Sequence, residues 1–318
     1  MIKFGVIGAG HLGKIHLDIL NNSNFNLVGF HDTDIIASKK LAKEKGYTFF
    51  ENINFLIQSI DAAIIVSPTT THYEIAKKCL KKGKHIFVEK PLTNNSIEAK
   101  EIERLANENK VIGQVGFVER YNPAFISCSE FIKNPKFIES HRLSDFNPRG
   151  TDVSVIMDLM IHDIDIILNI IDSKVKKIDA SGVSIISTSP DIANARIEFE
   201  NGTIANLTSS RISLKKMRKT RIFQSDAYIS INFLEKDFQV VKMRDKNNLD
   251  SENSIIIKNN IGEEKVIYFE NPQINQLNSI EAELIDFHNS IKNKLEPKVS
   301  LNDGLSALEV AEEIMSQL

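Results

Sequence analysis

The chain has 318 residues, of which 42% are hydrophobic and 25% charged, and its formal net charge is −3. These values are typical of a globular protein of about two domains, and the negative charge argues against general nucleic-acid binding. No leader peptide and no apolar run of the ~20 residues needed for a membrane span is recognisable. Cys79 and Cys128 have neither metal-ligand nor disulfide spacing. We therefore expect a cytoplasmic protein without a metal site, a membrane contact or a nucleic-acid partner.

The first predicted strand, residues 2–7, is a short apolar run that leads into a glycine-rich turn. Gly8, Gly10 and Gly13 form the pattern G-x-G-x-x-G. In this pattern the first glycine permits a tight turn, the second lets a pyrophosphate approach the backbone, and the third lets the next helix pack closely on the strand. The free N–H groups and the positive dipole end of that helix would then face the phosphates.

Asp32 follows the second predicted strand, residues 26–30. A carboxylate at this place can accept hydrogen bonds from the ribose hydroxyls and would repel a 2′-phosphate, which favours NAD over NADP. Two alternatives stay open. Asp32 could only cap the helix that begins near Asp34, or a neighbouring base could shift the choice, since Lys39 and Lys40 lie in that helix.

The pattern up to residue 119 alternates between helices and strands. Further helices are predicted over 35–45, 54–59, 73–82 and from the Asn95 cap to 109, and further strands over 47–50, 62–66, 85–88 and 111–117. The alternation predicts a parallel, doubly wound sheet, so we expect a Rossmann NAD-binding domain over residues 1–119. Ligands bind such sheets at the carboxyl ends of the strands. The cofactor-binding residues expected there are Gly8, Gly10, His11, Leu12, Asp32, Ser67, Pro68, Thr69, His72, Glu89 and Lys90.

From about residue 120 the pattern becomes rich in alternating strands. Helices are predicted over 123–132, 155–171, 280–292 and 305–316, and strands over 137–143, 178–186, 193–199, 204–211, 221–224, 228–233 and 238–243, with weaker ones near 255 and 266. We expect residues 120–318 to form an α/β domain for substrate binding and oligomerisation. Its large, mainly antiparallel sheet would pack one face on helices and leave the other open. An open face of this size predicts a homodimer or homotetramer.

The helix predicted over residues 155–171 carries a polar stripe in an otherwise apolar sequence. Asp158, His162, Asp165 and Asn169 follow at spacings of four, three and four, which places them on one helix face. The stripe could simply be the solvent side of a core helix. However, a carboxylate one turn from a histidine can orient it and favour its protonated form, as a general base near neutral pH requires.

Lys90 lies between Glu89 and Pro91 where a central strand ends. A lysine in a loop could be only a surface residue. At this edge of the sheet, though, its ammonium could hold a substrate hydroxyl beside a nicotinamide and stabilise the developing alkoxide. Lys90, Asp158 and His162 would then supply an electrophile, an orienting group and a base for alcohol oxidation.

The motifs of the chain resemble, in order and spacing, those of the Gfo/Idh/MocA oxidoreductases, a family named for glucose-fructose oxidoreductase and inositol dehydrogenase. The resemblance is carried by Gly8-x-Gly10-x-x-Gly13, the turn from Pro68 to His72, Glu89-Lys90-Pro91 and Asp158-x-x-x-His162, and it covers the whole chain. It implies a Rossmann domain and an α/β domain whose open sheet serves oligomerisation. It also implies catalysis by a lysine with a paired aspartate and histidine, roles that map onto Lys90, Asp158 and His162.

A narrower likeness is to the UDP-N-acetylglucosamine 3-dehydrogenase branch, and it is carried by residues 114–124, 149–153, 158–165 and 192–196. This branch implies oxidation of a sugar 3-hydroxyl and a partner aminotransferase in the synthesis of diamino lipid A. Arg120 and Arg149 are then expected beside the substrate, together with Lys90, Asp158 and His162.

Basic residues suited to a diphosphate gather in the second half of the chain. They are Lys215, Lys216, Arg218, Lys219 and Arg221, here called the basic cluster, with Arg120, Arg142, Arg149 and Arg211 elsewhere. The alternative for the cluster is a solvated strand edge guarded by charge.

Taken together, the sequence predicts an NAD-dependent dehydrogenase of a secondary hydroxyl on a nucleotide sugar, with the 3-hydroxyl of UDP-N-acetylglucosamine as the expected position. A dehydrogenase of a free sugar or inositol is the first alternative. A catalytically idle, NAD-bound sensor is the second, since this fold can serve such roles.

Overall fold

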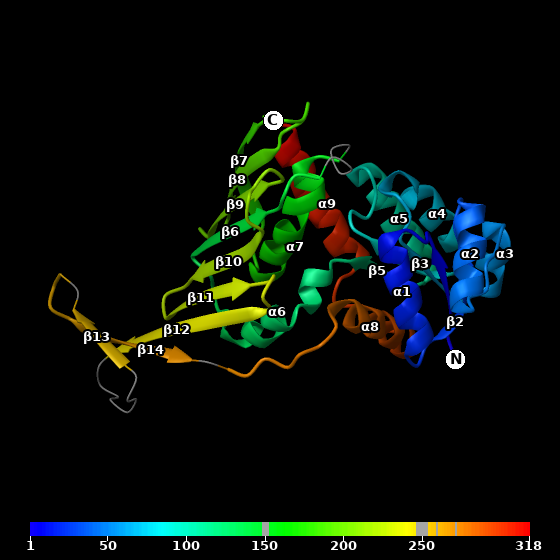
Figure 1. Cartoon of the computed structure of the whole chain (residues 1–318). Coiled ribbons are helices and arrows are strands. Elements are labelled where there is room, and N and C mark those ends of the chain that lie inside the picture. The colour runs from blue at the N-terminus through cyan, green and yellow to red at the C-terminus, as the bar shows by residue number, and fades with distance from the viewer. Residues whose placement is uncertain (148–152, 246–253, 259, 271) are drawn as a thin grey trace. The chain divides into compact units, whose positions relative to one another are not determined.

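The structure is a computed structural model that describes residues 1–147, 153–245, 254–258, 260–270 and 272–318 (Figure 1). It divides into two compact units. Unit 1 comprises Met1–Val118 and Asn278–Glu309, and unit 2 comprises Glu119–Leu277 and Val310–Leu318. None of the helices in the described part of the chain combines the length and apolar character needed to cross a membrane.

The first stretch of unit 1 ends at Val118, and the chain returns to unit 1 at Asn278. The helix α8 (Ser279–Asn293) returns to unit 1, because its buried Leu284 and Phe287 pack in the same hydrophobic core as Phe4 and Phe87. The last helix, α9 (Leu301–Met315), contributes to both units.

Unit 1 is built on a parallel sheet that, within the described residues, has five strands in the order β2-β1-β3-β4-β5 (Figure 1). The strands are β1 (Lys3–Ile7), β2 (Asn26–His31), β3 (Ala62–Ile65), β4 (His85–Glu89) and β5 (Gly113–Gly116). The order reverses direction between β1 and β3, and this switch point is where doubly wound sheets bind their ligands. The Rossmann prediction is thereby confirmed.

The expected strand over residues 47–50 is wrong. That segment forms a single bridge, between Phe30 and Phe49, with hydrogen bonds from Phe30 N to Thr48 O and from Phe50 N to Phe30 O. It is too short to continue the sheet because the Asn52 side chain already caps the next helix.

The remaining helices of unit 1 begin and end largely at the predicted signals. They are α1 (His11–Asn22), α2 (Ile35–Lys45), α3 (Ile53–Ser59), α4 (His72–Leu80) and α5 (Ser96–Asn109). Gly46 ends α2 in the left-handed conformation, at φ 74°. The Asn95 side chain accepts a hydrogen bond from Glu98 N at the start of α5. The Glu98 carboxylate, in contrast, turns back to Asn94 N at 3.3 Å.

Unit 2 contains a large mixed sheet with, among the described residues, nine strands in the order β13-β14-β12-β11-β10-β6-β9-β8-β7. The strands are β6 (Phe137–Leu143), β7 (Val175–Val183), β8 (Ile192–Phe199), β9 (Ile204–Ser210), β10 (Met217–Phe223), β11 (Ala227–Asn232), β12 (Asp237–Asp245), β13 (Ser254–Lys258) and β14 (Glu264–Glu270). All pairings are antiparallel except that of β6 with β9. The expected, mainly antiparallel sheet is thus confirmed.

Helices cover one face of this sheet. The helix α7 (Ile161–Ile170) packs on β6 and β9, and α6 (Pro123–Cys128) packs on β11 and β12 (Figure 1). Along β6 the side chains alternate accordingly. Ile138 and Ser140 are buried toward the helices, whereas Glu139 and His141 are only half-buried on the other face.

Candidate active site

The glycine-rich turn of unit 1 leaves a space of the kind that a pyrophosphate needs. Gly8 has φ 103°, and a Cβ there would lie 2.7 Å from Ser67 N, so the turns after β1 and β3 touch. A Cβ on Gly13 would lie 2.1 Å from the Gly8 carbonyl oxygen, so α1 packs directly on the turn. A Cβ on Gly10, in contrast, would meet nothing within 4 Å. The first N–H groups of α1 open onto this space, because the Gly10 cap brings no side chain to bond them.

Asp32 is tied to this turn and does not cap the next helix. Its Oδ2 accepts a hydrogen bond from Ala9 N at 2.6 Å, and its Oδ1 accepts one from Asp34 N at 2.9 Å. The helix cap is Asp34, whose Oδ1 accepts from Ala37 N. The capping alternative for Asp32 is therefore wrong.

The pocket beside Asp32 has the position expected for the adenosine end of a dinucleotide. It is lined by Ala9, Gly10, Lys14, Asp32, Asp34, Ala37, Ser38 and Leu41. The two lysines that could have shifted the choice toward NADP are engaged elsewhere: Lys39 pairs with Glu51 at 2.6 Å and Lys40 with Glu44 at 3.8 Å.

The turn after β3 is held by its own hydroxyls and by one buried imidazole. Ser67 Oγ lies 2.7 Å from Thr71 Oγ1, which donates to Pro68 O. The ring nitrogens of His72 lie 2.9 Å from Ser67 O and 2.9 Å from Pro91 O. Burial lowers the pKa of His72, although these carbonyl oxygens partly oppose the shift. Through these two contacts the buried His72 joins the turns that follow β3 and β4.

Glu89 ends β4, and Lys90 follows it at the same edge of the sheet. Glu89 Oε1 lies 3.0 Å from His16 Nε2 on α1. Lys90 is half-buried. The expected cofactor-binding positions thus come from three neighbouring strand ends, those of β1, β3 and β4, with Asp32 following β2.

Asp158 and His162 lie in unit 2, on a helix that is not regular. Residues Ile156–Met160 form a π-helical turn that leads into α7. Such turns are rare in proteins, and those that occur often lie at functional sites. Asp158 and His162 are half-buried, and Asn169 is exposed. Asp165, predicted on the same polar face, is buried at 1% exposure.

The expected diphosphate ligands Arg120 and Arg142 are engaged in buried ion pairs. Arg120 Nε donates to Asp165 Oδ2 at 2.8 Å. Arg142 makes two bonds of 3.0 Å to Asp163 and one of 3.0 Å to Glu119. Burial alone would lower the pKa of Arg142, but these two carboxylates raise it. The Arg142–Asp163 pair fixes the start of α7, the helix that carries His162, to β6, and the Arg120–Asp165 pair fixes the same helix to the segment Val118–Tyr121.

The basic cluster is not a strand edge. It lies on and just before β10, which pairs with β11 on one side and β6 on the other, so the edge-strand alternative is wrong. Arg218 lies 3.4 Å from Glu119, and Arg221 lies 2.6 Å from Glu139. Arg211 donates to Val153 O from a buried position. Arg149, also expected at the substrate, lies outside the described residues.

Sequence reasoning missed three features of this region. Lys14 lines the pocket beside Asp32. The Glu119–Arg142–Asp163 network joins distant segments. His16 falls on the buried stripe of α1 with Gly13, Leu17 and Leu20, a spacing that could have revealed it.

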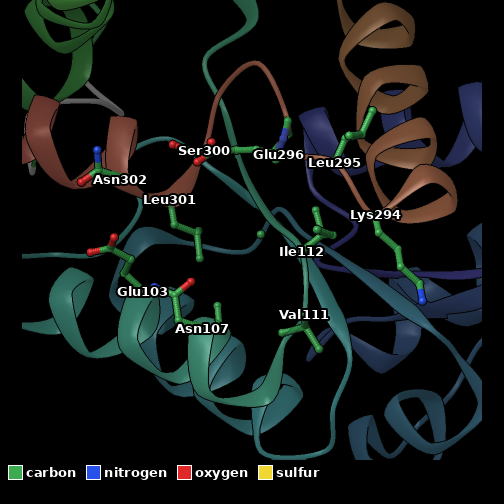
Figure 2. Close-up of a pocket in the computed structure, with 13 residues that line it drawn as sticks. Glu103, Asn107, Val111, Ile112, Lys294, Leu295, Glu296, Ser300, Leu301 and Asn302 are labelled. Atoms are coloured by element: carbon green, nitrogen blue, oxygen red, sulfur yellow. The ribbon is translucent and has the colours of Figure 1, made fainter.

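Another pocket of unit 1 lies apart from these residues. Figure 2 shows it between α5, with Glu103 and Asn107, and the segment that carries Leu295 and Leu301. None of the predicted site residues lines this pocket, so the glycine-turn edge stays the candidate site of unit 1.

A Rossmann unit with this open glycine cradle and a carboxylate after β2 has the features of a dinucleotide-binding domain. Comparison with known proteins agrees. Residues 2–117 match the oxidoreductase family described by its NAD-binding Rossmann fold, and residues 133–230 match the GFO/IDH/MocA C-terminal domain. The chain therefore belongs to the Gfo/Idh/MocA oxidoreductases, and its cofactor is NAD.

Named relatives are dehydrogenases of sugars and inositols. The chain is 33% identical over 244 residues, covering 75% of this chain and 76% of the relative, to a UDP-N-acetylglucosamine 3-dehydrogenase of Acidithiobacillus ferrooxidans. It is 30% identical over 234 residues, 67% and 68% of the two chains, to a scyllo-inositol 2-dehydrogenase (NAD(+)) of Bacillus subtilis. A solved structure of the Acidithiobacillus enzyme superposes with a TM-score of 0.89 at 29% identity and covers 100% of this chain and 97% of that chain.

Proposed function

We propose that this enzyme oxidises the 3-hydroxyl of UDP-N-acetylglucosamine to the 3-keto sugar. The observation that carries the proposal is the likeness to the Acidithiobacillus enzyme of that name, which extends over three quarters of both sequences and the whole of this fold. The 3-keto product is the substrate that a pathway aminotransferase would need for diamino lipid A. We place this reaction in the cytoplasm.

The proposed catalytic residues are Lys90, Asp158 and His162. NAD, when bound at the glycine turn, supplies the hydride acceptor. The Lys90 Nζ donates a hydrogen bond to the substrate oxygen and stabilises the charge that develops there. A ring nitrogen of His162 takes the hydroxyl proton, while Asp158 orients the ring and supports its protonated form. In reduction of the ketone, the protonated His162 returns this proton.

The binding residues are proposed with them. The cofactor is held by Gly8, Gly10, His11, Leu12, Asp32, Ser67, Pro68, Thr69, Glu89 and Lys90, with His72 fixing the turns, and the substrate is bound by Lys90, Arg120, Arg149, Asp158 and His162. In this proposal Arg120 acts through its ion pair with Asp165, because its guanidinium is buried.

A dehydrogenase of inositol or a free sugar is the second candidate, favoured by the likeness to the Bacillus scyllo-inositol 2-dehydrogenase. An idle NAD-bound sensor is the third. The presence of Lys90, Asp158 and His162 together argues against a sensor, because a protein that only binds NAD needs neither Asp158 nor His162.

The test is an absorbance assay at the NADH band with UDP-N-acetylglucosamine, scyllo- and myo-inositol and free hexoses. A trapping aminotransferase is added in case the equilibrium lies toward the alcohol. We expect NADH only with the UDP sugar. Turnover of an inositol in preference to it would overturn the substrate assignment, and NAD binding without turnover of any of them would favour the sensor.

We also propose a homo-oligomer formed through the open face of the unit 2 sheet. This face carries a pocket lined by Glu139, His141, Met217, Lys219, Arg221 and Tyr228. Its lining is mostly polar and ranges from half-buried to exposed, which suits a surface that pairs with a second copy. Light scattering of Arg221→Glu against the wild type tests this, and an unchanged mass would contradict it.

A further inference from the structure

Three titratable side chains from three elements meet inside unit 1, and only one of them, Glu89, enters the proposed function. They are His16 on α1, Glu89 at the end of β4 and Glu283 on α8, and their polar atoms lie within 4.8 Å of one another. His16 and Glu283 are 0% exposed. The Glu89 side chain is 12% exposed. We call these residues the buried triad.

The hydrogen bonds of the triad indicate where its protons reside. His16 Nε2 lies 3.0 Å from Glu89 Oε1, while His16 Nδ1 is buried and, among the described residues, has no hydrogen-bond partner. This pattern fits a neutral ring that donates from Nε2 to a Glu89 carboxylate, because a bare ring nitrogen is less costly to bury than an N–H without an acceptor.

Glu283 completes the triad as a neutral acid. Both of its carboxyl oxygens are buried and lack a hydrogen-bond partner in the described part of the chain. An ionised carboxylate in such a place would cost several kcal/mol. Burial, and then the charge of Glu89, raise the pKa of Glu283 well above its ordinary value.

Other side chains of the described residues lie close to the triad. Gln114 Nε2 donates to the backbone oxygen of Glu283 at 2.9 Å, and the Phe87 ring lies 5.5 Å from that of His16. His72 lies near enough for Glu89 to oppose the lowering of its pKa by burial. The nearest cation along the chain is Lys90, which directly follows Glu89.

The triad also fixes the end of β4. A Cβ on Gly116 would lie 2.9 Å from the Glu89 carboxyl carbon, so β5 presses on this carboxylate from one side. His16 holds it from another. A second negative charge on Glu283 would repel Glu89 and loosen the strand end from which Lys90 departs.

We propose that His16 and Glu283 are positioning residues for Lys90: a neutral Glu283 and a donating His16 keep one negative charge, in one orientation, on Glu89. The proposal rests on the proposed role of Lys90 and goes beyond it. It predicts that the alkaline limit of turnover depends on ionisation of Glu283, a residue outside the proposed cofactor- and substrate-binding residues.

The first test compares kcat at pH 7 and pH 9 for the wild type and Glu283→Gln, which keeps the shape of a neutral acid. Because burial and the charge of Glu89 raise the pKa of Glu283, its ionisation falls on the alkaline side, and we expect the ratio of kcat at pH 9 to kcat at pH 7 to be at least about twofold larger in E283Q. Infrared spectra at pH 7 should show a protonated-carboxyl band that E283Q lacks. Equal ratios, or no such band, would overturn the proposal.

The second test concerns His16. In His16→Leu, kcat should fall by about 10-fold or more through misplacement of Lys90, with the Kd for NAD changed less than threefold. His16→Gln places an amide N–H near the position of Nε2 and should recover most of the loss. Thermal melts of both variants establish that they fold. Equal kcat in H16L, or failure of H16Q to recover activity while folded, would overturn the proposal.

Two controls separate the possible failures. Stoichiometric metal in the purified protein, removed by EDTA with loss of activity, would replace the proton assignment by a metal site and overturn it. An active Lys90→Ala variant would refute the role of Lys90 in the proposed function. An inactive K90A together with a fully active H16L would refute only the buried triad.

Discussion

Two glycines of the same turn should respond oppositely when each is replaced by alanine. Gly10 has φ −65° and ψ −162°, a conformation open to alanine, and its Cβ would meet nothing within 4 Å. Gly10→Ala should therefore leave the free protein's unfolding free energy within about 0.5 kcal/mol of the wild type. A Cβ at Gly13 would lie 2.1 Å from the Gly8 carbonyl oxygen. Gly13→Ala must displace α1 from the turn, at a cost of about 1–3 kcal/mol or more.

The stabilisation by bound NAD should distinguish the two variants in the opposite way. At 100 times its Kd, NAD stabilises the wild type by about 2.7 kcal/mol, which corresponds to roughly 5–10 °C in Tm. If the space beside Gly10 receives the pyrophosphate, a methyl group there occupies the phosphate path. G10A should then lose most of this ligand-induced shift while keeping the wild-type Tm without NAD. G13A should melt roughly 3–10 °C lower even without NAD.

Differential scanning calorimetry with and without NAD measures both quantities for the two variants and the wild type. A full NAD-induced shift in G10A would refute the assignment of this space to the pyrophosphate. A G13A variant as stable as the wild type would refute the close packing of α1 on the turn.

Four further substitutions test other parts of the structure. Lys90→Ala should lower turnover by roughly 10²-fold or more with NAD binding nearly intact, and NADH absorbance beside an NAD thermal shift measures both; wild-type turnover would remove Lys90 from the mechanism. Arg142→Met leaves two buried carboxylates without their cation and should cost about 3–5 kcal/mol in urea unfolding. Lys39→Ala, which breaks an exposed ion pair, should lower the unfolding free energy by at most about 1 kcal/mol. Equal losses of unfolding free energy in the Arg142→Met and Lys39→Ala variants would contradict the difference expected between a buried and an exposed pair. Asp191 Oδ2 accepts hydrogen bonds from three backbone N–H groups, at 2.8, 2.6 and 3.0 Å, and these lower its pKa although burial raises it. The folding stability that Asp191 contributes is therefore present above the unfolded-state pKa of about 3.9 and is lost as pH falls below it. Asp191→Ala should make Tm depend less steeply on pH in the acid range. An unchanged acid dependence of Tm would contradict this.

Much of the fold could be predicted because its signals are local. Gly46 ends α2 and Asn95 begins α5 where the sequence indicated, since a left-handed cap and a side-chain acceptor act within one helical turn. The glycine turn and Asp32 were predictable for the same reason, because each depends only on the conformation or chemistry at the end of its own strand.

What could not be predicted depends on contacts between distant segments. The interior position of β10 follows from pairing with β6, about eighty residues earlier, which no local pattern reveals. The engagement of Arg142 by Asp163 and Glu119 likewise depends on three separate elements. The π-helical turn at Asp158 has no periodicity of its own in so short a segment.

The central claim, that Lys90 and His162 act on the same substrate hydroxyl, is tested most directly by a double-mutant cycle. Turnover of UDP-N-acetylglucosamine is measured for Lys90→Ala, His162→Ala and the double variant, with NAD saturating in each. Residues that act as a unit are strongly non-additive. We predict losses of roughly 10²-fold or more for each single variant and about the same loss for the double variant. Losses that multiply, or either single variant at wild-type turnover, would contradict the account.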